Sequence, residues 1–160
     1  MRFLNFLKNE RVFQILRKAV LVCPLVVLTG CFGKSPPPIV EVKGTVLLNG
    51  KPLSKAKVQF IPQIDFGPEY IAMGLTDENG QFQLTCMGQS GACACTNLVT
   101  IHEQDVPDEL LLETAQAKLK AYRESLKNRP IPMKYASLAK TPLKVEVTAD
   151  KQQYDFTLSR

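Results

Sequence analysis

The chain has 160 residues, of which 45% are hydrophobic, and a formal net charge of +5. This charge does not indicate nucleic-acid binding, because the first 30 residues hold five of the 20 basic residues and only one of the 15 acidic ones, which leaves +1 for the rest. The 130 residues that follow are enough for one domain with a single core.

The first 30 residues have the organisation of an export signal. Basic residues precede the uncharged run Ala19–Leu28, which is about half as long as a membrane-spanning helix. A basic flank, a short apolar stretch and small residues at its end are typical of a signal peptide. A buried amphipathic helix is the alternative, but Pro24 inside the run and Arg17 and Lys18 beside it argue against that structure. We therefore predict that residues 1–30 are a signal peptide.

Leu28-Thr29-Gly30-Cys31 resembles the lipobox of bacterial lipoproteins. The resemblance implies that the Cys31 sulfur carries a diacylglycerol, that a peptidase cuts before Cys31, and that the new amino group is acylated. Two or more acyl chains hold a protein firmly on a bilayer, so membrane lipid is the expected partner. By resemblance to enteric-type sorting, Phe32 favours the outer membrane, and the exported protein is expected in the periplasm or on the outer face of the envelope. Residues 31–39, with three consecutive prolines, are expected to form an extended tether.

From Val40 onward, short alternating runs between turn residues predict β-strands. Asn49-Gly50 is the strongest short hairpin signal, because both residues tolerate a positive φ. The strands are expected at Val40 with Val42 and Thr45–Leu48, then at Ala56–Pro62, Tyr70–Thr76, Gln81–Cys86, Leu98–His102, Leu143–Val147 and Tyr154–Leu158. The last two are expected as a pair around a turn at 149–153.

One segment has a helical period instead. Within Pro107–Lys127 the apolar residues recur at steps of three or four, at Leu111, Ala115, Leu119, Tyr122 and Leu126. We predict one inserted α-helix near 107–127, inside an insertion of about 104–130. We expect this helix to pack on the side of the β-sheets, in preference to binding a partner.

Several of these pieces together resemble the carboxypeptidase regulatory-like domain, above all that of small bacterial lipoproteins built from one such domain. The resemblance rests on Gly44–Val46, Asn49–Leu53, Val58–Pro62 and Gly74–Leu84, and on Ile131–Tyr135, Thr141–Leu143 and Tyr154–Leu158. It implies that residues 40–160 form a mainly β, seven-stranded Greek-key β-sandwich of the transthyretin-like (prealbumin-like) type, without chemistry of its own. The chain departs from the family pattern at Gly91–Leu98, where the family has a glycine followed by an aromatic residue.

Three cysteines remain beyond Cys31, namely Cys86, Cys93 and Cys95. Outside the cytoplasm thiols oxidise, and an odd number leaves one over. A bond between Cys93 and Cys95 is disfavoured, because alternate residues of an extended chain are poorly placed for it. We therefore expect a disulfide from Cys86 to either Cys93 or Cys95. The alternative is a zinc site that adds His102, but this spacing matches no usual zinc module, so no metal and no other cofactor is expected.

Catalysis is not expected either. His102 is the only histidine and has no nucleophile motif around it. Asp77, Glu78 and Asn79 suit a turn better than a calcium site. We predict a non-catalytic, membrane-anchored lipoprotein with a structural or binding role in the cell envelope, with no nucleic-acid partner and with its protein or glycan partner unidentified. The alternatives are a carbohydrate- or peptide-binding module that uses the loops Gln63–Glu69 and Met87–Cys95, and a cysteine-based metal or redox protein.

Overall fold

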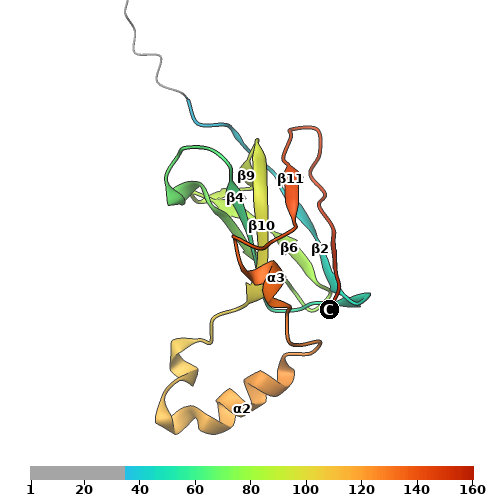
Figure 1. The fold of residues 1–160 in the computed structure, drawn as a ribbon. Helices are drawn as coiled ribbons and strands as arrows, with labels where there is room; N and C mark the ends of the chain where they lie inside the picture. The colour runs from blue at the N-terminus through green and yellow to red at the C-terminus, as the bar shows by residue number, and fades with distance from the viewer. Residues whose placement is uncertain (1–34) are drawn as a thin grey trace, which may run out of the picture. The chain divides into compact units, whose positions relative to one another are not determined.

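β-strands make up most of the fold, as expected (Figure 1). The computed structural model describes residues 35–160, so the predicted signal peptide and Cys31 lie outside the described residues. The strands are β1 (Ile39–Val40), β2 (Lys43–Leu48), β3 (Lys51–Pro52), β4 (Ala56–Pro62), β5 (Ala72–Leu75), β6 (Gln81–Gln83), β7 (Thr85–Cys86), β8 (Gln89–Ser90), β9 (Ala92–Cys93), β10 (Thr96–Glu103), β11 (Lys144–Glu146) and β12 (Phe156–Leu158). The helices are η1 (Pro68–Tyr70), η2 (Asp108–Leu110), η3 (Glu113–Ala115), α2 (Gln116–Ser125) and α3 (Met133–Ala136). None of the helices in this part of the chain is long and apolar enough to cross a membrane.

The larger sheet has six strands in the order β11-β10-β4-β5-β7-β8, and its neighbours are antiparallel. Its longest pairing joins β4 and β10, with Val58 opposite Ile101 and Phe60 opposite Val99. The smaller sheet contains β12, β2 and β3, and β6 also pairs with β2. In this sheet β12 runs parallel to β2, with Phe156 opposite Val46.

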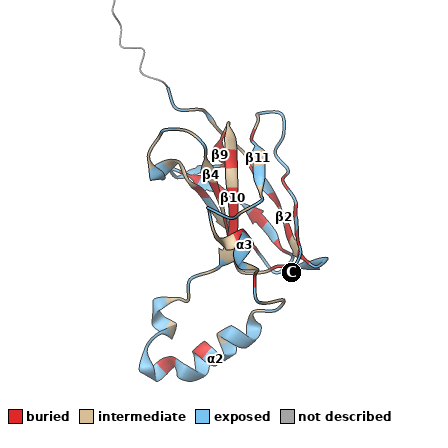
Figure 2. Cartoon of the chain, viewed as in Figure 1, coloured by how far each residue is buried: buried red, intermediate tan, exposed pale blue. Residues whose placement is uncertain are grey.

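The two sheets share one apolar core. Residues alternate between buried and accessible along β2 and β4, as the sequence pattern predicts for strands with one covered face (Figure 2). Phe60 of β4 is fully buried, and its ring centroid lies 6.4 Å from that of Phe82, 5.9 Å from that of Tyr154 and 6.0 Å from that of Phe156. Aromatic side chains from both sheets therefore meet in the centre of the core.

The predicted hairpin at Asn49-Gly50 is confirmed. Asn49 has a φ of 52° and Gly50 a φ of 74°, and Leu48 pairs with Lys51 across the two-residue turn. Asp77 forms the expected side-chain turn, because its Oδ1 accepts hydrogen bonds from the backbone N–H groups of Asn79 and Gln81, both at 2.8 Å.

Two expectations about strand pairing are wrong. The stretch Gln81–Cys86 is not one strand, because β6 pairs with β2 in the smaller sheet, whereas β7 pairs with β5 in the larger one. The last two predicted strands do not pair with each other, since β11 lies beside β10 and β12 beside β2. Alternation shows which side chains are covered, but it does not show which strand lies alongside.

The predicted helix exists only in part, and the expectation that it packs on the sheets is wrong. The insertion, residues 104–127 (the arm), contains the short helices η2 and η3 and then α2, and it stands away from the sheets (Figure 1). Ala115 and Leu119 are buried but lie outside the main core cluster, and Leu111 and Leu112 are 57% and 60% exposed. The buried residues of the apolar stripe are therefore covered mainly by other parts of the arm, and not by the main core.

Candidate functional site: the dock for the entry segment

The chain enters the β-sheets through residues 36–40, the entry segment, which lies against Gly91–Cys95, the dock. Strand β1 pairs with β9, with Ile39 opposite Cys93 and Val40 opposite Ala92. The N–H of Ala94 also donates to the carbonyl of Pro38 at 2.9 Å. A proline lacks an N–H but keeps its acceptor, so the end of the proline tract can still be held by backbone hydrogen bonds.

Gly91 makes this close approach possible. Its φ is +126°, and a Cβ placed on it would lie 1.9 Å from the carbonyl oxygen of Val40. Its N–H donates to the carbonyl of Leu84 at 2.7 Å, which ties the dock to the chain between β6 and β7. The entry segment therefore rests on Gly91–Cys95, within the stretch where the sequence differs from the pattern of the family that it was expected to resemble.

Two cysteine side chains lie together beneath the dock. The Sγ atoms of Cys86 and Cys93 lie 3.3 Å and 3.9 Å from the same acceptor, the carbonyl oxygen of Tyr70, and both residues are buried. Burial raises the pKa of the Cys86 thiol. Burial, together with the neighbouring Cys86, raises the pKa of the Cys93 thiol to about 12. Both groups are therefore protonated and poorly nucleophilic near neutral pH.

Cys95 lies in different surroundings. It is half-buried, and its Sγ lies 3.7 Å from Nδ2 of Asn97. Burial and the nearby Glu146 carboxylate raise the pKa of this thiol. Asn97 is fully buried and donates from Nδ2 to the carbonyls of Cys93 at 3.1 Å and Cys95 at 2.8 Å, which holds the turn between β9 and β10. All three cysteines are free thiols in the structure, and Cys86 and Cys93 are the two that share a contact atom.

The structure does not bring His102 to the cysteines. His102 lies near the far end of β10, about 20 Å along an extended strand from Cys95. Its Nε2 lies 3.0 Å from Oε1 of Gln59, and its Nδ1 lies 3.0 Å from the carbonyl of Glu103. Residues 35–160 contain no group of three or more His, Cys, Asp or Glu side chains that could hold a metal ion.

The loop Gln63–Glu69 does not present a flat aromatic surface. Phe66 and Tyr70 are both half-buried, and their rings pack on each other at 5.4 Å with a tilt of 47°. The carbonyl of Tyr70 is the acceptor that the two buried thiols share. Glu69 at the end of this loop and Tyr70 directly after it therefore lie against the buried cysteines, a role that the sequence did not indicate.

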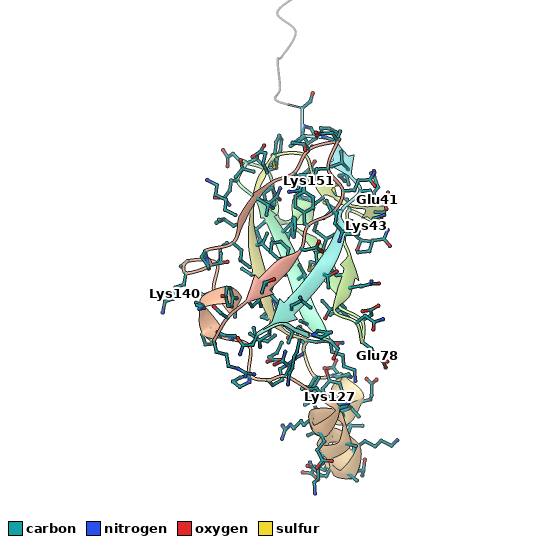
Figure 3. The ribbon with its side chains drawn as sticks, turned by 90° about the vertical axis from the view of Figure 1, so that its right-hand side faces the viewer. Glu41, Lys43, Glu78, Lys127, Lys140 and Lys151 are labelled. Atoms are coloured by element: carbon teal, nitrogen blue, oxygen red, sulfur yellow. The ribbon has the colours of Figure 1, made fainter. Side chains whose placement is uncertain are left out.

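Sequence analysis missed a polar hollow of about 490 Å³ over β2 and β6. Its lining includes Lys43, Thr45, Asp77, Gln81, Gln83 and Gln153. Figure 3 shows Lys43 together with Glu41 and Lys151 in the upper part of the strand region, and Glu78 and Lys127 at its lower end, next to the arm. The alternation of Gln81 and Gln83 around the buried Phe82 is the sequence feature that places both amides on the outer face.

No family model matches the chain, and neither do the curated proteins or the solved structures with which it was compared.

Proposed function

We propose that this chain is a non-catalytic bacterial lipoprotein, a structural or binding module of the cell envelope that is anchored through acylated Cys31. The observation that carries this proposal is the position of the lipobox-like Leu28–Cys31. It follows an uncharged run, and only the short proline-containing stretch Phe32–Pro38 separates it from β1, which is already paired with β9. A lipid on Cys31 would thus be joined to the folded unit by a short tether.

We further infer that residues 40–160 form a transthyretin-like, seven-stranded Greek-key β-sandwich of the carboxypeptidase regulatory-like kind. Two sheets with a common core support this fold, and so does the overlap of each of the seven predicted strands with strands of these sheets, although the predicted strand Gln81–Cys86 is divided between β6 and β7. The short strands β1, β3, β8 and β9 are additions to that plan. A non-catalytic role agrees with the engagement of His102 by Gln59 and Glu103.

The positions of the entry segment and the arm suggest which end of the folded domain would face the membrane. Within residues 36–160, the entry segment and the arm lie at opposite ends (Figure 1). We propose that the end that carries the dock faces the membrane, because the anchor would join the folded unit there, and that the arm, with Leu111 and Leu112, is at the end away from the membrane. By the sorting resemblance of Phe32, we place the protein on the outer membrane.

Mass spectrometry of the full chain, expressed from its own start codon in a lipoprotein-processing bacterium, tests the anchor. The expected product lacks residues 1–30 and carries acyl groups on Cys31. Cys31→Ser should remain unprocessed and without lipid. Cys23→Ser is the matched control, since it removes a cysteine of the same leader and should be processed normally. An intact Met1 without fatty acid in the unmutated chain would refute the proposal.

The second candidate function is carbohydrate binding, and the polar hollow favours it. Its amide, hydroxyl, carboxylate and ammonium groups suit a ligand rich in hydroxyls. Saturable retention of the anchored chain on peptidoglycan or purified envelope glycans would support this role. Binding that does not saturate would leave the structural role.

A further inference from the structure

We propose that Cys86 and Cys93 form a disulfide that fastens the dock to the larger sheet and so secures the entry segment against tension from the anchor. This inference rests on the proposed function, because export takes the chain to a compartment where disulfides persist. It selects one pair from the three cysteines and gives that bond a mechanical role.

The first step in the argument is the choice of pair. Cys86 and Cys93 are 1% and 0% exposed, and both thiols contact the carbonyl oxygen of Tyr70. Cys95 contacts Asn97 instead and is the residue left over. The segment from Cys86 to Cys93 reverses at Met87 and Gly88, whose φ values are 50° and 75°, and this reversal brings the chain back toward Cys86.

The second step concerns what the bond would connect. In the part of the chain that the structure describes, β9 pairs with β1 and with no other strand, through two residue pairs. Cys86 lies in β7, which belongs to the six-stranded sheet. A bond from Cys86 to Cys93 therefore joins the two-stranded β1–β9 sheet covalently to the six-stranded one. Without that bond, β9 is held beside the six-stranded sheet by noncovalent contacts such as the hydrogen bond from the Gly91 N–H to the Leu84 carbonyl at 2.7 Å, so β9 can move with β1 under a pull. With the bond, β9 stays in place and β1 must first break its own hydrogen bonds to β9.

The third step is the chemistry. Two thiols lose two protons and two electrons as the Cys86–Cys93 bond forms. The oxidant is a disulfide-bearing protein of the envelope, which forms a mixed disulfide with one cysteine, is displaced by the other, and leaves as a dithiol. Because burial raises the pKa of both thiols, they react poorly once covered, so the exchange takes place while the chain is folding.

Methionine cleavage provides a direct test, because Met87 lies between the two cysteines. The full chain is expressed from its own start codon in a lipoprotein-processing bacterium, denatured in N-ethylmaleimide, and cut with cyanogen bromide. We expect fragments Gly74–Met87 and Gly88–Met133 to stay joined until reduction, and of Cys86, Cys93 and Cys95 only Cys95 to carry the label. Cys95→Ala should keep the link, whereas Cys93→Ala should lose it. Three labelled thiols in the unmutated chain would overturn the inference, and so would a link that survives Cys93→Ala.

A second measurement addresses the mechanical role without any variant. Hydrogen exchange at the amides of Gly91 and Ala94 should be about tenfold slower in the oxidised chain than in the same chain after mild reduction. Equal exchange in the two forms would show that the bond does not secure the dock. The mass of the same sample distinguishes a failure of the disulfide proposal from a failure of the proposed function. Lipid on Cys31 with three free thiols refutes the disulfide alone, whereas an intact Met1 without lipid refutes the proposed function.

Discussion

At the scale of single residues, two glycines of one loop show what the dock requires. Gly88 and Gly91 both have a positive φ, at +75° and +126°. A Cβ on Gly88 would meet nothing within 4 Å, whereas one on Gly91 would lie 1.9 Å from the carbonyl oxygen of Val40. Gly88 is therefore needed only for its backbone conformation, and Gly91 also for the space that the entry segment occupies.

We predict that Gly88→Ala lowers the free energy of unfolding by about 1 kcal/mol, the usual cost of a side chain in left-handed backbone. Gly91→Ala should lower it by about 3 kcal/mol, because the added methyl group also displaces β1. Urea unfolding of the two variants measures this difference, and limited proteolysis should cut near residue 40 in Gly91→Ala alone. Equal effects of the two changes would mean that β1 is not held against Gly91.

At the scale of elements, the arm is a separate addition to the β-sheets. Polar side chains join it to the strand region through a hydrogen bond of 3.0 Å from Lys55 Nζ to Ser125 Oγ and an ion pair of 3.2 Å between Lys57 and Asp105. The Lys55 ammonium also lies 5.2 Å from the centroid of the Tyr122 ring. Where the arm rejoins the sheets, Arg129 bonds to Glu103 and donates to the carbonyl of Ser54 at 2.6 Å. The two ends of the arm are thus fixed close together, independently of α2.

Replacing residues 107–126 by a short Gly/Ser linker should therefore change the melting temperature by less than about 5 °C, because few contacts with the main core are lost. Tyr135→Ala is the matched comparison. Tyr135 of α3 lies in the core cluster, and its hydroxyl accepts from the N–H of Ser159 at 3.1 Å. That change should cost about 3 kcal/mol or more. Thermal unfolding compares the two, and a collapse of the linker variant would place the arm in the core.

Sequence patterns correctly predicted those elements that are determined by residues close together in the sequence. The hairpin at Asn49-Gly50 and the alternation in Ala56–Pro62 depend on neighbouring residues, and both were found. Which strand accompanies β12 and what covers Leu111 depend on distant parts of the chain, and both expectations were wrong. For the same reason the sequence named Cys86, Cys93 and Cys95 but left their pairing open, because the shared Tyr70 carbonyl comes from a loop about twenty residues away.

At the scale of the whole molecule, the buried thiols make the reduced protein sensitive to alkali. The pKa of Cys93 is about 12 in the folded chain against an ordinary value of 9.0, so between these values the unfolded state loses a proton that the folded state keeps. The contribution of this thiol to stability is complete below pH 9 and is lost as the pH rises toward 12. The urea midpoint of the reduced full chain should therefore fall more steeply above pH 9 than that of Cys93→Ala. Parallel pH curves for the two would contradict this expectation.

The parallel alignment of β12 with β2 has a consequence for biosynthesis. The N–H of Thr45 donates a hydrogen bond to Oδ1 of Asp155, 110 residues further along, and Leu48 lies opposite Leu158. A ribosome releases β2 long before it has synthesised β12, so the smaller sheet is completed only near the end of synthesis. Contacts so distant in sequence also form slowly. A nascent chain of this topology therefore remains unfolded for longer, and an unfolded polypeptide is the form that can pass through a narrow translocation pore.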